Sequence, residues 1–222
     1  MASSHLKRIV APKTWPILRK TTKFVTRPKP NGQSLERTLP VVVIMRELLA
    51  MVQTAQQAKT ILRTVPVTVN GKRIYDTDSA VGFMDLLVIN GNAFRVMITT
   101  GNTLSVIPAK DQIILQKIVG KTSVAKGKTQ INCSSGRTLI VTKDEYKTGD
   151  SIALTQNKIT AHYPLGKGAC VLLTGGSHIG KVGHVDEIDG QMITITAEGQ
   201  SFTTAKRHAY VVGTQKPAIA LT

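Results

Sequence analysis

A glycine-rich stretch late in the sequence, GACVLLTGGSHIGKVGHV at 168–185, contains most of a phosphate-binding loop. Gly175, Gly180 and Lys181 match the spacing of G-x-x-x-x-G-K-[ST], in which backbone amides and a lysine hold the phosphates of a nucleotide. That motif also needs a hydroxyl residue for Mg²⁺ after the lysine, and a helix that begins at the loop. This chain has Val182 there, followed by a β-patterned segment. We therefore predict strand, loop and strand, and no nucleotide hydrolysis.

The other residues with catalytic potential do not form a known site in the sequence. Asp76 and Asp78 resemble a pair of carboxylates, but they belong to a turn-rich segment that explains them. Cys133 and Cys170 lie far apart without a CxxC motif, which favours two buried thiols over a zinc site or a disulfide. Neither a helical zinc motif nor a nucleophile motif accompanies the histidines, which are His5, His162, His178, His184 and His208. We predict no catalytic residues, no metal and no cofactor, and hence no enzyme.

Net charge is the most informative property of the sequence. The 222 residues include 29 Lys and Arg against 13 Asp and Glu, a net charge of +16. Half of this surplus lies in residues 1–40. A folded chain tolerates such repulsion most readily beside a polyanion, so nucleic acid is the predicted partner. An anionic membrane surface is a weaker alternative because no basic amphipathic helix stands out, and no apolar run reaches the ~18 residues of a membrane span.

The first predicted element is the basic segment 1–40, which has five prolines and no sustained helix or strand period. We expect an extended arm that orders on a partner, and a disordered linker is the alternative. Trp15 and Phe24 lie among the cations, where they can stack on bases or on the folded body. The arm residues assigned to RNA are Lys7, Arg8, Lys13, Trp15, Arg19, Lys20, Lys23, Arg27, Lys29 and Arg37.

Residues 41–92 predict a small α/β module. Pro40 suits the first position of a helix over 41–52, whose apolar stripe at helical spacing belongs to a core. Thr54 and Gln57 form a capping box for a second helix that runs to about Arg63. The Asn70-Gly71 pair then favours a type I′ hairpin, because both residues accept positive φ.

Four cations of this module could form a local RNA-binding patch: Lys59, Arg63, Lys72 and Arg73. The two lysine and arginine pairs lie on one helix face and at one hairpin tip. A solvated helix face and a solvated turn explain the same spacing equally well.

Residues 93–165 contain short alternating or β-branched runs, which predict a small barrel or sandwich. A helical turn over 111–117 is an open alternative. The lysine-rich segment 120–128 is either an RNA-facing hairpin or a charged loop, and we favour RNA contacts through Lys121, Lys126 and Lys128. In the loop at 174–181, Ser177, His178 and Lys181 are expected to touch RNA or a neighbouring protein, and His178 and Lys181 are assigned to RNA. A scaffold turn without contacts is the alternative.

Several segments together resemble one protein family. TAQQAKTIL, VTVNGKRI and VGFMDLLVI are similar to the S-four RNA-binding domain. Together with HLKRIVAPKTW and LERTLPVVVIMRELL, they resemble the small-subunit ribosomal protein "S-four-e" family of archaea and eukaryotes. Its KOW motif is matched by Gly168, Val171, Gly175, Gly180, Gly183 and Val185. The match implies a five-stranded SH3-like barrel, where Gly183 would let the chain bend or allow close backbone approach. Gln56 and 31–33 (Asn-Gly-Gln) depart from the family pattern.

This resemblance implies an α+β, multidomain fold: a basic extension at 1–40, an S-four-like RNA-binding domain at 41–92, a central β-rich domain at 93–165, a KOW barrel at 166–215 and a tail at 216–222. It implies a cytoplasmic, structural protein of the small ribosomal subunit that acts in translation. The expected partners are small-subunit rRNA, at its 5′ region, and neighbouring ribosomal proteins, with no membrane and no small-molecule substrate. A KOW-containing transcription elongation-type factor and an RNA-modifying enzyme with an S-four-type domain are the alternatives.

Overall fold

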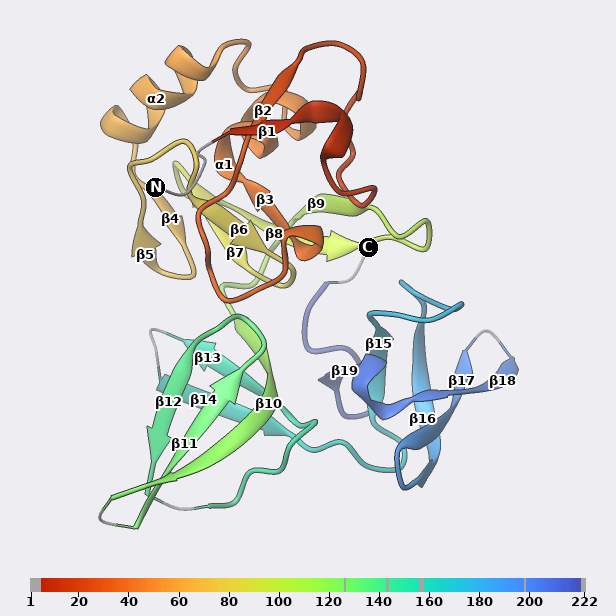
Figure 1. The fold of residues 1–222 in the computed structure, drawn as a ribbon. Helices are drawn as coiled ribbons and strands as arrows, with labels where there is room; N and C mark the ends of the chain where they lie inside the picture. The colour runs from red at the N-terminus through yellow and green to blue at the C-terminus, as the bar shows by residue number, and fades with distance from the viewer. Residues whose placement is uncertain (1–4, 126, 143, 156–157, 198, 221–222) are drawn as a thin grey trace. The chain divides into compact units, whose positions relative to one another are not determined.

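The structure is a computed structural model that describes residues 5–125, 127–142, 144–155, 158–197 and 199–220. Most of its regular elements are short strands, which belong to several separate sheets, and helices are few (Figure 1). The chain divides into two compact units, Met1–Met97 with Thr103–Gln112 and Ile98–Asn102 with Ile113–Thr222. The α+β, multidomain fold that we predict is therefore confirmed in its coarser part, as several sheets with few helices.

The first unit contains strands, two α-helices and short 3-10 and π segments. In chain order they are β1 (His5–Lys7), η1 (Arg8–Val10), β2 (Phe24–Thr26), η2 (Leu35–Arg37), β3 (Thr38–Pro40), α1 (Val41–Val43), η3 (Ile44–Leu48), α2 (Ala55–Thr64), β4 (Val67–Val69), β5 (Lys72–Arg73), β6 (Ala80–Gly82), β7 (Leu86–Ile89), β8 (Asn92–Ile98) and β9 (Leu104–Pro108). The main sheet has the strand order β5-β4-β7-β8-β9, and two small sheets pair β1 with β2 and β3 with β6.

Two Asn-Gly turns shape the main sheet. Asn70 and Gly71 have φ values of 51° and 80°, as a type I′ hairpin requires, and they join β4 to β5. The predicted hairpin is therefore confirmed. Asn90 and Gly91 repeat this conformation, with φ values of 48° and 83°, and join β7 to β8.

This second hairpin changes the expected domain boundary. We placed the start of the central domain at residue 93, but β8 and β9 complete the sheet of the first unit. The signal was present in the sequence as VINGNAF, an Asn-Gly pair between two apolar runs. The strand after this tight hairpin pairs with the strand before it, so residue 93 lies inside the sheet of the first unit. The division of the chain into domains of distinct function stays a prediction.

The helix predicted over 41–52 is much shorter. Only Val41–Val43 is α-helical, and a π-helical segment, Ile44–Leu48, follows, in which the Leu49 amide donates to the Ile44 carbonyl at 2.9 Å. All five residues of the VVVIM run at 41–45 are buried, so this segment is apolar on every side. Successive β-branched side chains crowd a regular helix, which favours the shorter element.

The second helix follows its sequence signals closely. Thr54 Oγ1 accepts a hydrogen bond from the Gln57 amide at 3.2 Å, while Gln57 Oε1 accepts from the Thr54 amide at 3.1 Å. This reciprocal pair is the predicted capping box, and it begins α2. Ala58 and Leu62 are buried on one face of the helix. The opposite face, with the predicted RNA-binding cations, is exposed.

A buried polar network holds the first hairpin against the rest of the main sheet. Asn70 Nδ2 donates to Asp85 Oδ1 at 2.7 Å, and Asn70 Oδ1 accepts from the Leu86 amide at 2.9 Å. The other carboxylate oxygen of Asp85 accepts from the Gly82 amide at 2.7 Å. Asn70 and Asp85 are both buried, so these bonds satisfy groups that water does not reach.

The amino-terminal segment is not the extended arm that we expected. Its described part is folded onto the first unit, where β3 pairs with β6 and the Lys29 amide donates to the Asp78 carbonyl at 2.9 Å. Asn31 and Gln33, at the departure from the family pattern, are also engaged. Asn31 Oδ1 accepts from the Gln33 amide at 3.2 Å, and the Gln33 side chain accepts from the Phe83 amide at 3.0 Å. Contacts within the chain order the described part of this segment, so its folding does not need the external partner that the proline-rich composition suggested.

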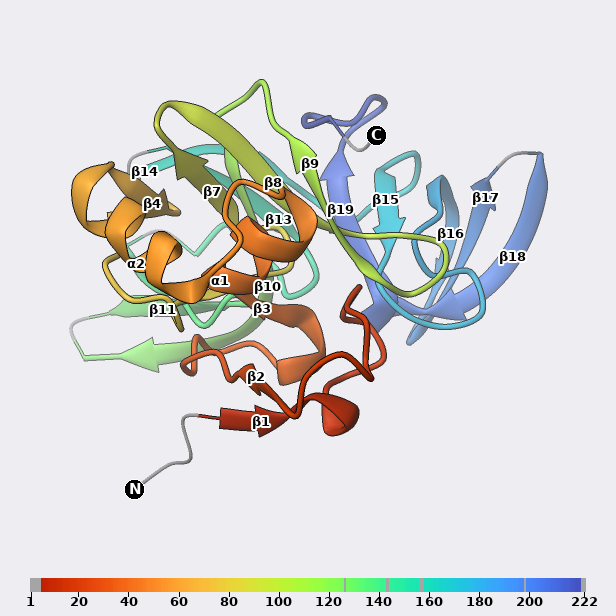
Figure 2. The same cartoon turned by 90° about the horizontal axis from the view of Figure 1, so that it is seen from above.

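The second unit consists of two antiparallel five-stranded sheets. Its elements are β10 (Ile114–Val124), β11 (Lys128–Cys133), β12 (Thr138–Val141), β13 (Ser151–Thr155), β14 (Lys158–Tyr163), β15 (Cys170–Leu173), β16 (Val182–Asp189), β17 (Met192–Ala197), β18 (Gln200–Ala205), η4 (Lys206–His208) and β19 (Ala209–Gly213). The strand orders are β12-β11-β10-β13-β14 and β18-β17-β16-β15-β19, and Figure 2 shows the second order. The helical turn allowed at 111–117 is wrong, because β10 occupies most of that range.

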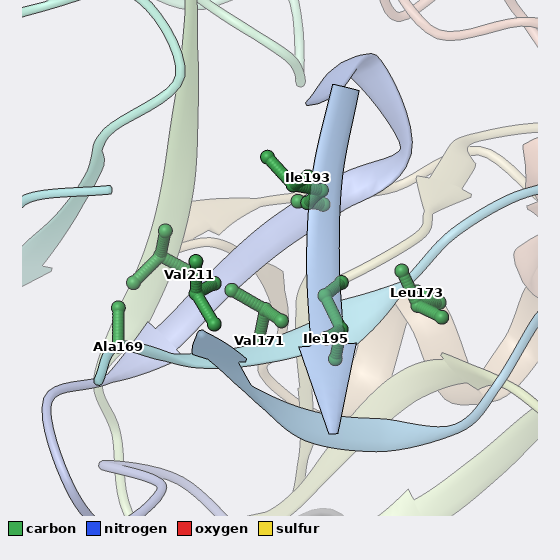
Figure 3. Packing of buried hydrophobic residues seen from close by; sticks show 8 residues of the cluster. Ala169, Val171, Leu173, Ile193, Ile195 and Val211 are labelled. Atoms are coloured by element: carbon green, nitrogen blue, oxygen red, sulfur yellow. The ribbon is translucent and has the colours of Figure 1, made fainter. Parts of the chain in front are cut away.

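Residues of four strands build the core of the β15–β19 sheet. One buried cluster contains Ala169, Val171, Leu173, Val185, Ile193, Ile195, Ala209 and Val211, and Figure 3 labels six of them. The spacing of two along each strand places these side chains on a single face. Between β15 and β16 the described chain forms a loop without a helix. The predicted strand–loop–strand arrangement is confirmed, and a P-loop geometry is absent from this segment.

Gly183 lies where this sheet leaves no room for a side chain. A Cβ atom at this position would be 2.6 Å from the carbonyl oxygen of Thr196 and 2.7 Å from Cγ2 of Ile195. These distances are shorter than ordinary contacts, and one partner is backbone. The close backbone approach predicted for Gly183 is therefore present.

We predict that Asn70→Ala destabilises the protein more than Asn90→Ala. Both residues occupy hairpin turns with nearly equal φ values, but only Asn70 is buried. The difference between the two variants in the free energy of unfolding should be about 1–3 kcal/mol, because Asp85 Oδ1 and the Leu86 amide each lose the hydrogen bond that they make with the Asn70 side chain. Urea unfolding of the full chain measures it, and equal destabilisation would contradict the role of the network.

We predict that Gly183→Ala lowers the free energy of unfolding by about 1–3 kcal/mol, because the added methyl overpacks the sheet. Gly166→Ala is the control, since a Cβ atom at Gly166 meets no atom within 4 Å. Thermal unfolding compares the two. If both variants unfold at the same temperature as the wild-type chain, β16 can shift enough to admit a side chain at position 183.

Candidate nucleic-acid interface

Most of the surplus positive charge lies in the first unit, which has 16 Lys and Arg residues against 6 Asp and Glu. The structure separates the predicted RNA-binding residues of this unit into exposed and internally bonded ones. The exposed ones are Lys7, Lys13, Lys20, Lys23, Arg27, Lys29, Lys59, Arg63, Lys72 and Arg73. Exposed cations of this kind can contact phosphates directly.

Arg8 is buried and belongs to the internally bonded group. Its Nη2 donates to Glu47 Oε2 at 2.6 Å, Nη1 donates to Thr22 Oγ1 at 3.3 Å, and Nε donates to the Leu18 carbonyl. Arg46 Nη2 reaches the other oxygen of Glu47 at 2.8 Å. The guanidinium of Arg8 therefore connects the amino-terminal segment to the π-helical segment, and it has no exposed donor surface for RNA.

Trp15 and Arg19 also stabilise the folding of the amino-terminal segment. Trp15 is 2% exposed, and its indole Nε1 donates to the Leu35 carbonyl at 3.1 Å. Arg19 donates to the carbonyls of Ala11 and Pro12, at 2.6 and 2.7 Å. Of the two stacking roles considered for Trp15, the structure shows packing inside the folded body. Arg37, another residue of this segment that is assigned to RNA from the sequence, is half-buried.

Lys29 is exposed but already has two acidic neighbours. Its Nζ lies 2.6 Å from Asp76 Oδ2 and 3.4 Å from Asp78 Oδ1. The hydrogen bond to Asp76 raises the pKa of Lys29 above its usual value and lowers that of Asp76. The two aspartates, considered above as paired carboxylates, therefore form an exposed ion cluster that fixes this turn to the amino-terminal segment.

The helix face and the hairpin tip remain candidates for an RNA-binding patch. Lys59 and Arg63 project from the exposed face of α2, and Lys72 and Arg73 form the short strand after the type I′ turn. The charge of Lys59 contributes to the lowered pKa of Asp76, so the helix face lies near the turn that follows the hairpin. Arg73 also lies over the exposed ring of Tyr75, with Cζ 5.0 Å from the ring centroid.

In the second unit, the segment 120–128 forms the predicted hairpin between β10 and β11, with Val124 opposite Lys128. Lys128 is exposed near the tip, while Lys121 donates to the Tyr146 carbonyl at 2.6 Å and pairs with Asp144. Lys126 lies outside the described residues. The hairpin form is confirmed, and its contact with RNA stays a prediction.

The loop at 174–181 packs against its own sheet. The rings of His178 and Phe202 are stacked, with centroids 4.0 Å apart and an interplanar angle of 22°. Lys181 is half-buried at the end of the loop.

The basic segment Lys206–Arg207 precedes β19 and is not among the predicted RNA-binding residues, although its KRH run is visible in the sequence.

Nothing in the described ranges suggests a metal centre, because no group of three or more His, Cys, Asp or Glu side chains there could hold an ion. Cys133 and Cys170 are buried and free, as predicted. Burial raises the pKa of Cys133 to about 11 and also raises that of Cys170, so both thiols stay protonated and unreactive near neutral pH. None of the helices described is long and apolar enough to cross a bilayer.

We predict that Arg8→Ala destabilises the protein, whereas Lys7→Ala does not. Removing one partner of a buried ion pair costs about 3–5 kcal/mol, while Lys7 is exposed in the adjacent position. Thermal unfolding of the full chain checks both variants. An Arg8→Ala protein as stable as the wild type would show that Arg46 alone suffices for Glu47.

Comparisons with known proteins agree with this picture. The family model described as Ribosomal family S4e matches residues 90–159, and the RS4NT (NUC023) domain matches residues 2–30. A protein of Methanocella arvoryzae named small ribosomal subunit protein eS4 is 37% identical, over 99% of this chain and 98% of its own length. A protein of Methanosphaera stadtmanae with the same name is also 37% identical, over 98% of this chain and 95% of its own length.

A solved structure extends the likeness to the fold. The crystal structure of the 30S ribosomal protein S4e from Thermoplasma acidophilum aligns with a TM-score of 0.70 and 26% identity, over 80% of this chain and 96% of that chain. The family identified from the residues of the amino-terminal segment, the helix and hairpin module and the glycine-rich loop is therefore confirmed. Near full-length identity above 30% to its members is the decisive finding: this chain belongs to the S4e family of ribosomal proteins.

Proposed function

We propose that the chain is a structural constituent of the small ribosomal subunit, where it binds rRNA and takes part in translation in the cytoplasm. The observation that carries this proposal is the match along almost the whole chain to proteins named small ribosomal subunit protein eS4. The exposed cations of the first unit support it, because they provide a surface for a polyanion. Ribosomal protein families are not an enzyme class, in keeping with the absence of a catalytic motif in the sequence.

Binding would rest mainly on phosphate contacts. Each Lys or Arg that neutralises a phosphate releases condensed counterions, so affinity falls as salt rises. The bases of duplex RNA are hidden in a deep and narrow major groove, so backbone and shape should dominate recognition of its helical parts. Folding of the amino-terminal segment onto the protein supports this function, because ordered cations lose less conformational entropy when they bind.

Finer assignments belong to the same proposal. We assign the contacts of the exposed cations to the 5′ region of the rRNA. The remaining surface is assigned to contacts with neighbouring ribosomal proteins. We also assign an S-four-like RNA-binding role to the helix α2 and hairpin module, and a KOW-type SH3-like fold to residues 166–215. The five-stranded antiparallel order of β15–β19 and the close approach at Gly183 support the last assignment.

The proposed contact residues differ from the sequence-based set in one respect. Arg8, Trp15 and Arg19 are now proposed to hold the protein together, because their polar groups bond within the amino-terminal segment or to Glu47. Deleting residues 1–38 would therefore remove part of the folded unit together with the charge. Substitution of exposed side chains is the sharper test.

We predict that replacing five exposed cations of the amino-terminal segment with Gln weakens rRNA binding and flattens its salt dependence. The residues are Lys7, Lys13, Lys20, Lys23 and Arg27. The slope of log K against log salt should fall by about one for each phosphate that is no longer neutralised. Filter binding to a transcript of the 5′ domain of small-subunit rRNA, at several salt concentrations, measures this slope.

A control with the same reduction of charge replaces five exposed lysines outside the proposed contacts. These are Lys110, Lys147, Lys158, Lys167 and Lys216. If both variants change the slope equally, net charge alone attracts the RNA, and the cations of the amino-terminal segment contribute no more to binding than the control lysines do. A separate variant, Lys59→Glu with Arg63→Glu, should also reduce binding without unfolding the chain. Co-sedimentation of the wild-type chain with small ribosomal subunits tests the assembly itself.

A further inference from the structure

A hollow of about 560 Å³ lies in the first unit between the amino-terminal segment and the π-helical segment. Its volume falls within the range of about 300–1,000 Å³ that is usual for small-molecule pockets. The β1–β2 ribbon lies beside this part of the chain in Figure 1, and β2 supplies one wall. The lining residues are Arg8, Thr21, Thr22, Phe24, Val25, Thr26, Arg46, Glu47 and Gln53.

The charge of the lining suits an anion. Glu47 is the only acidic residue among these lining residues, and both of its carboxylate oxygens accept hydrogen bonds from arginines, Arg8 and Arg46. Two guanidinium groups against one carboxylate leave a net charge of +1. The side chain of Arg46 is 28% exposed, so it is partly accessible to solvent. Lys23 adds a second positive charge next to the lining residue Phe24.

The hollow also presents an aromatic ring. Phe24 is 44% exposed although it is a large apolar residue, and Nζ of Lys23 lies 5.4 Å from the centroid of its ring. An exposed ring beside a cation can stack on a nucleobase while the cation approaches the attached phosphate. The neighbouring Val25 is buried, so the strand that carries Phe24 is anchored.

Polar side chains complete the lining. Thr21, Thr22 and Gln53 are exposed, and the two hydroxyls donate to the carbonyls of Leu18 and Phe24, each at 3.2 Å. Each hydroxyl oxygen can still accept a hydrogen bond from a ribose 2′-OH, and an amide can pair with the edge of a base. The backbone amide of Gln53 donates to Gln57 Oε1 at 2.8 Å, so this residue is held at the start of α2.

We propose that this hollow takes one unpaired nucleotide of rRNA. The base stacks on Phe24, its phosphate lies near Lys23 and Arg46, and its sugar and base edges face the threonines and Gln53. A paired nucleotide does not fit this arrangement, because its base is already stacked within the helix. The inference rests on the proposed rRNA-binding function and adds to it a point of contact with a base, where the exposed cations elsewhere contact only phosphates.

The test compares Phe24→Leu and Phe24→Tyr in the full chain, with the 5′-domain rRNA transcript as probe. Removal of one base–aromatic stack should weaken binding by Phe24→Leu roughly 5- to 150-fold. The tyrosine variant should keep the wild-type affinity, because it retains the ring. The salt slope should stay unchanged in both, since no charge is removed. An affinity of the leucine variant equal to that of the wild type overturns the proposal.

Met51→Ala is the matched control, because Met51 is equally exposed, at 45%, and lies outside the lining. It should bind as the wild type does, and equally weakened binding by this variant also overturns the proposal. Ultraviolet crosslinking followed by mass spectrometry should join a single-stranded nucleotide to the peptide 24–27 in the wild-type protein. A crosslink only to paired nucleotides argues against the hollow. Failure of the wild-type chain to bind the transcript at all would instead refute the proposed function.

Discussion

The buried ion pair between Arg8 and Glu47 is the interaction on which the folding of the amino-terminal segment onto the first unit depends. It places one arginine of the basic amino-terminal segment inside the protein, with partners on both sides of the guanidinium. Loss of Arg8 would leave the largely buried carboxylate of Glu47 with Arg46 as its remaining arginine partner, and breaking a buried ion pair is costly. The pair therefore keeps the amino-terminal segment folded. Arg8 and Glu47 also line the hollow, together with Phe24 and Arg46.

The other cations likewise divide into internally paired ones and solvent-exposed ones. Lys29 binds two aspartates and Lys121 binds Asp144, whereas exposed residues such as Lys20 and Lys72 present their charge to solvent. Net charge identifies the class of partner, because a surplus of +16 calls for a polyanion. Internal pairing then determines which of these charges can meet that partner.

The buried Asn70–Asp85 contact explains how the hairpin cations are positioned. The turn residue Asn70 serves both the type I′ conformation and the polar network, so the hairpin is fixed at its base. Lys72 and Arg73 begin directly after the turn, and their backbone direction is set by the same residue. A patch with a rigid base loses less entropy when it binds RNA.

Local signals in the sequence determined much of this protein. The Thr54 and Gln57 capping box, the Asn70-Gly71 turn and the β-patterned residues after Lys181 each depend on interactions within a few residues, and each prediction from them is confirmed. The tertiary structure decided what depends on distant partners: the folding of residues 5–40, the π-helical segment and the burial of Arg8, whose partner Glu47 lies 39 residues away. A composition rich in proline and charge does not reveal such a partner, because the free energy that orders the segment comes from contacts far along the chain.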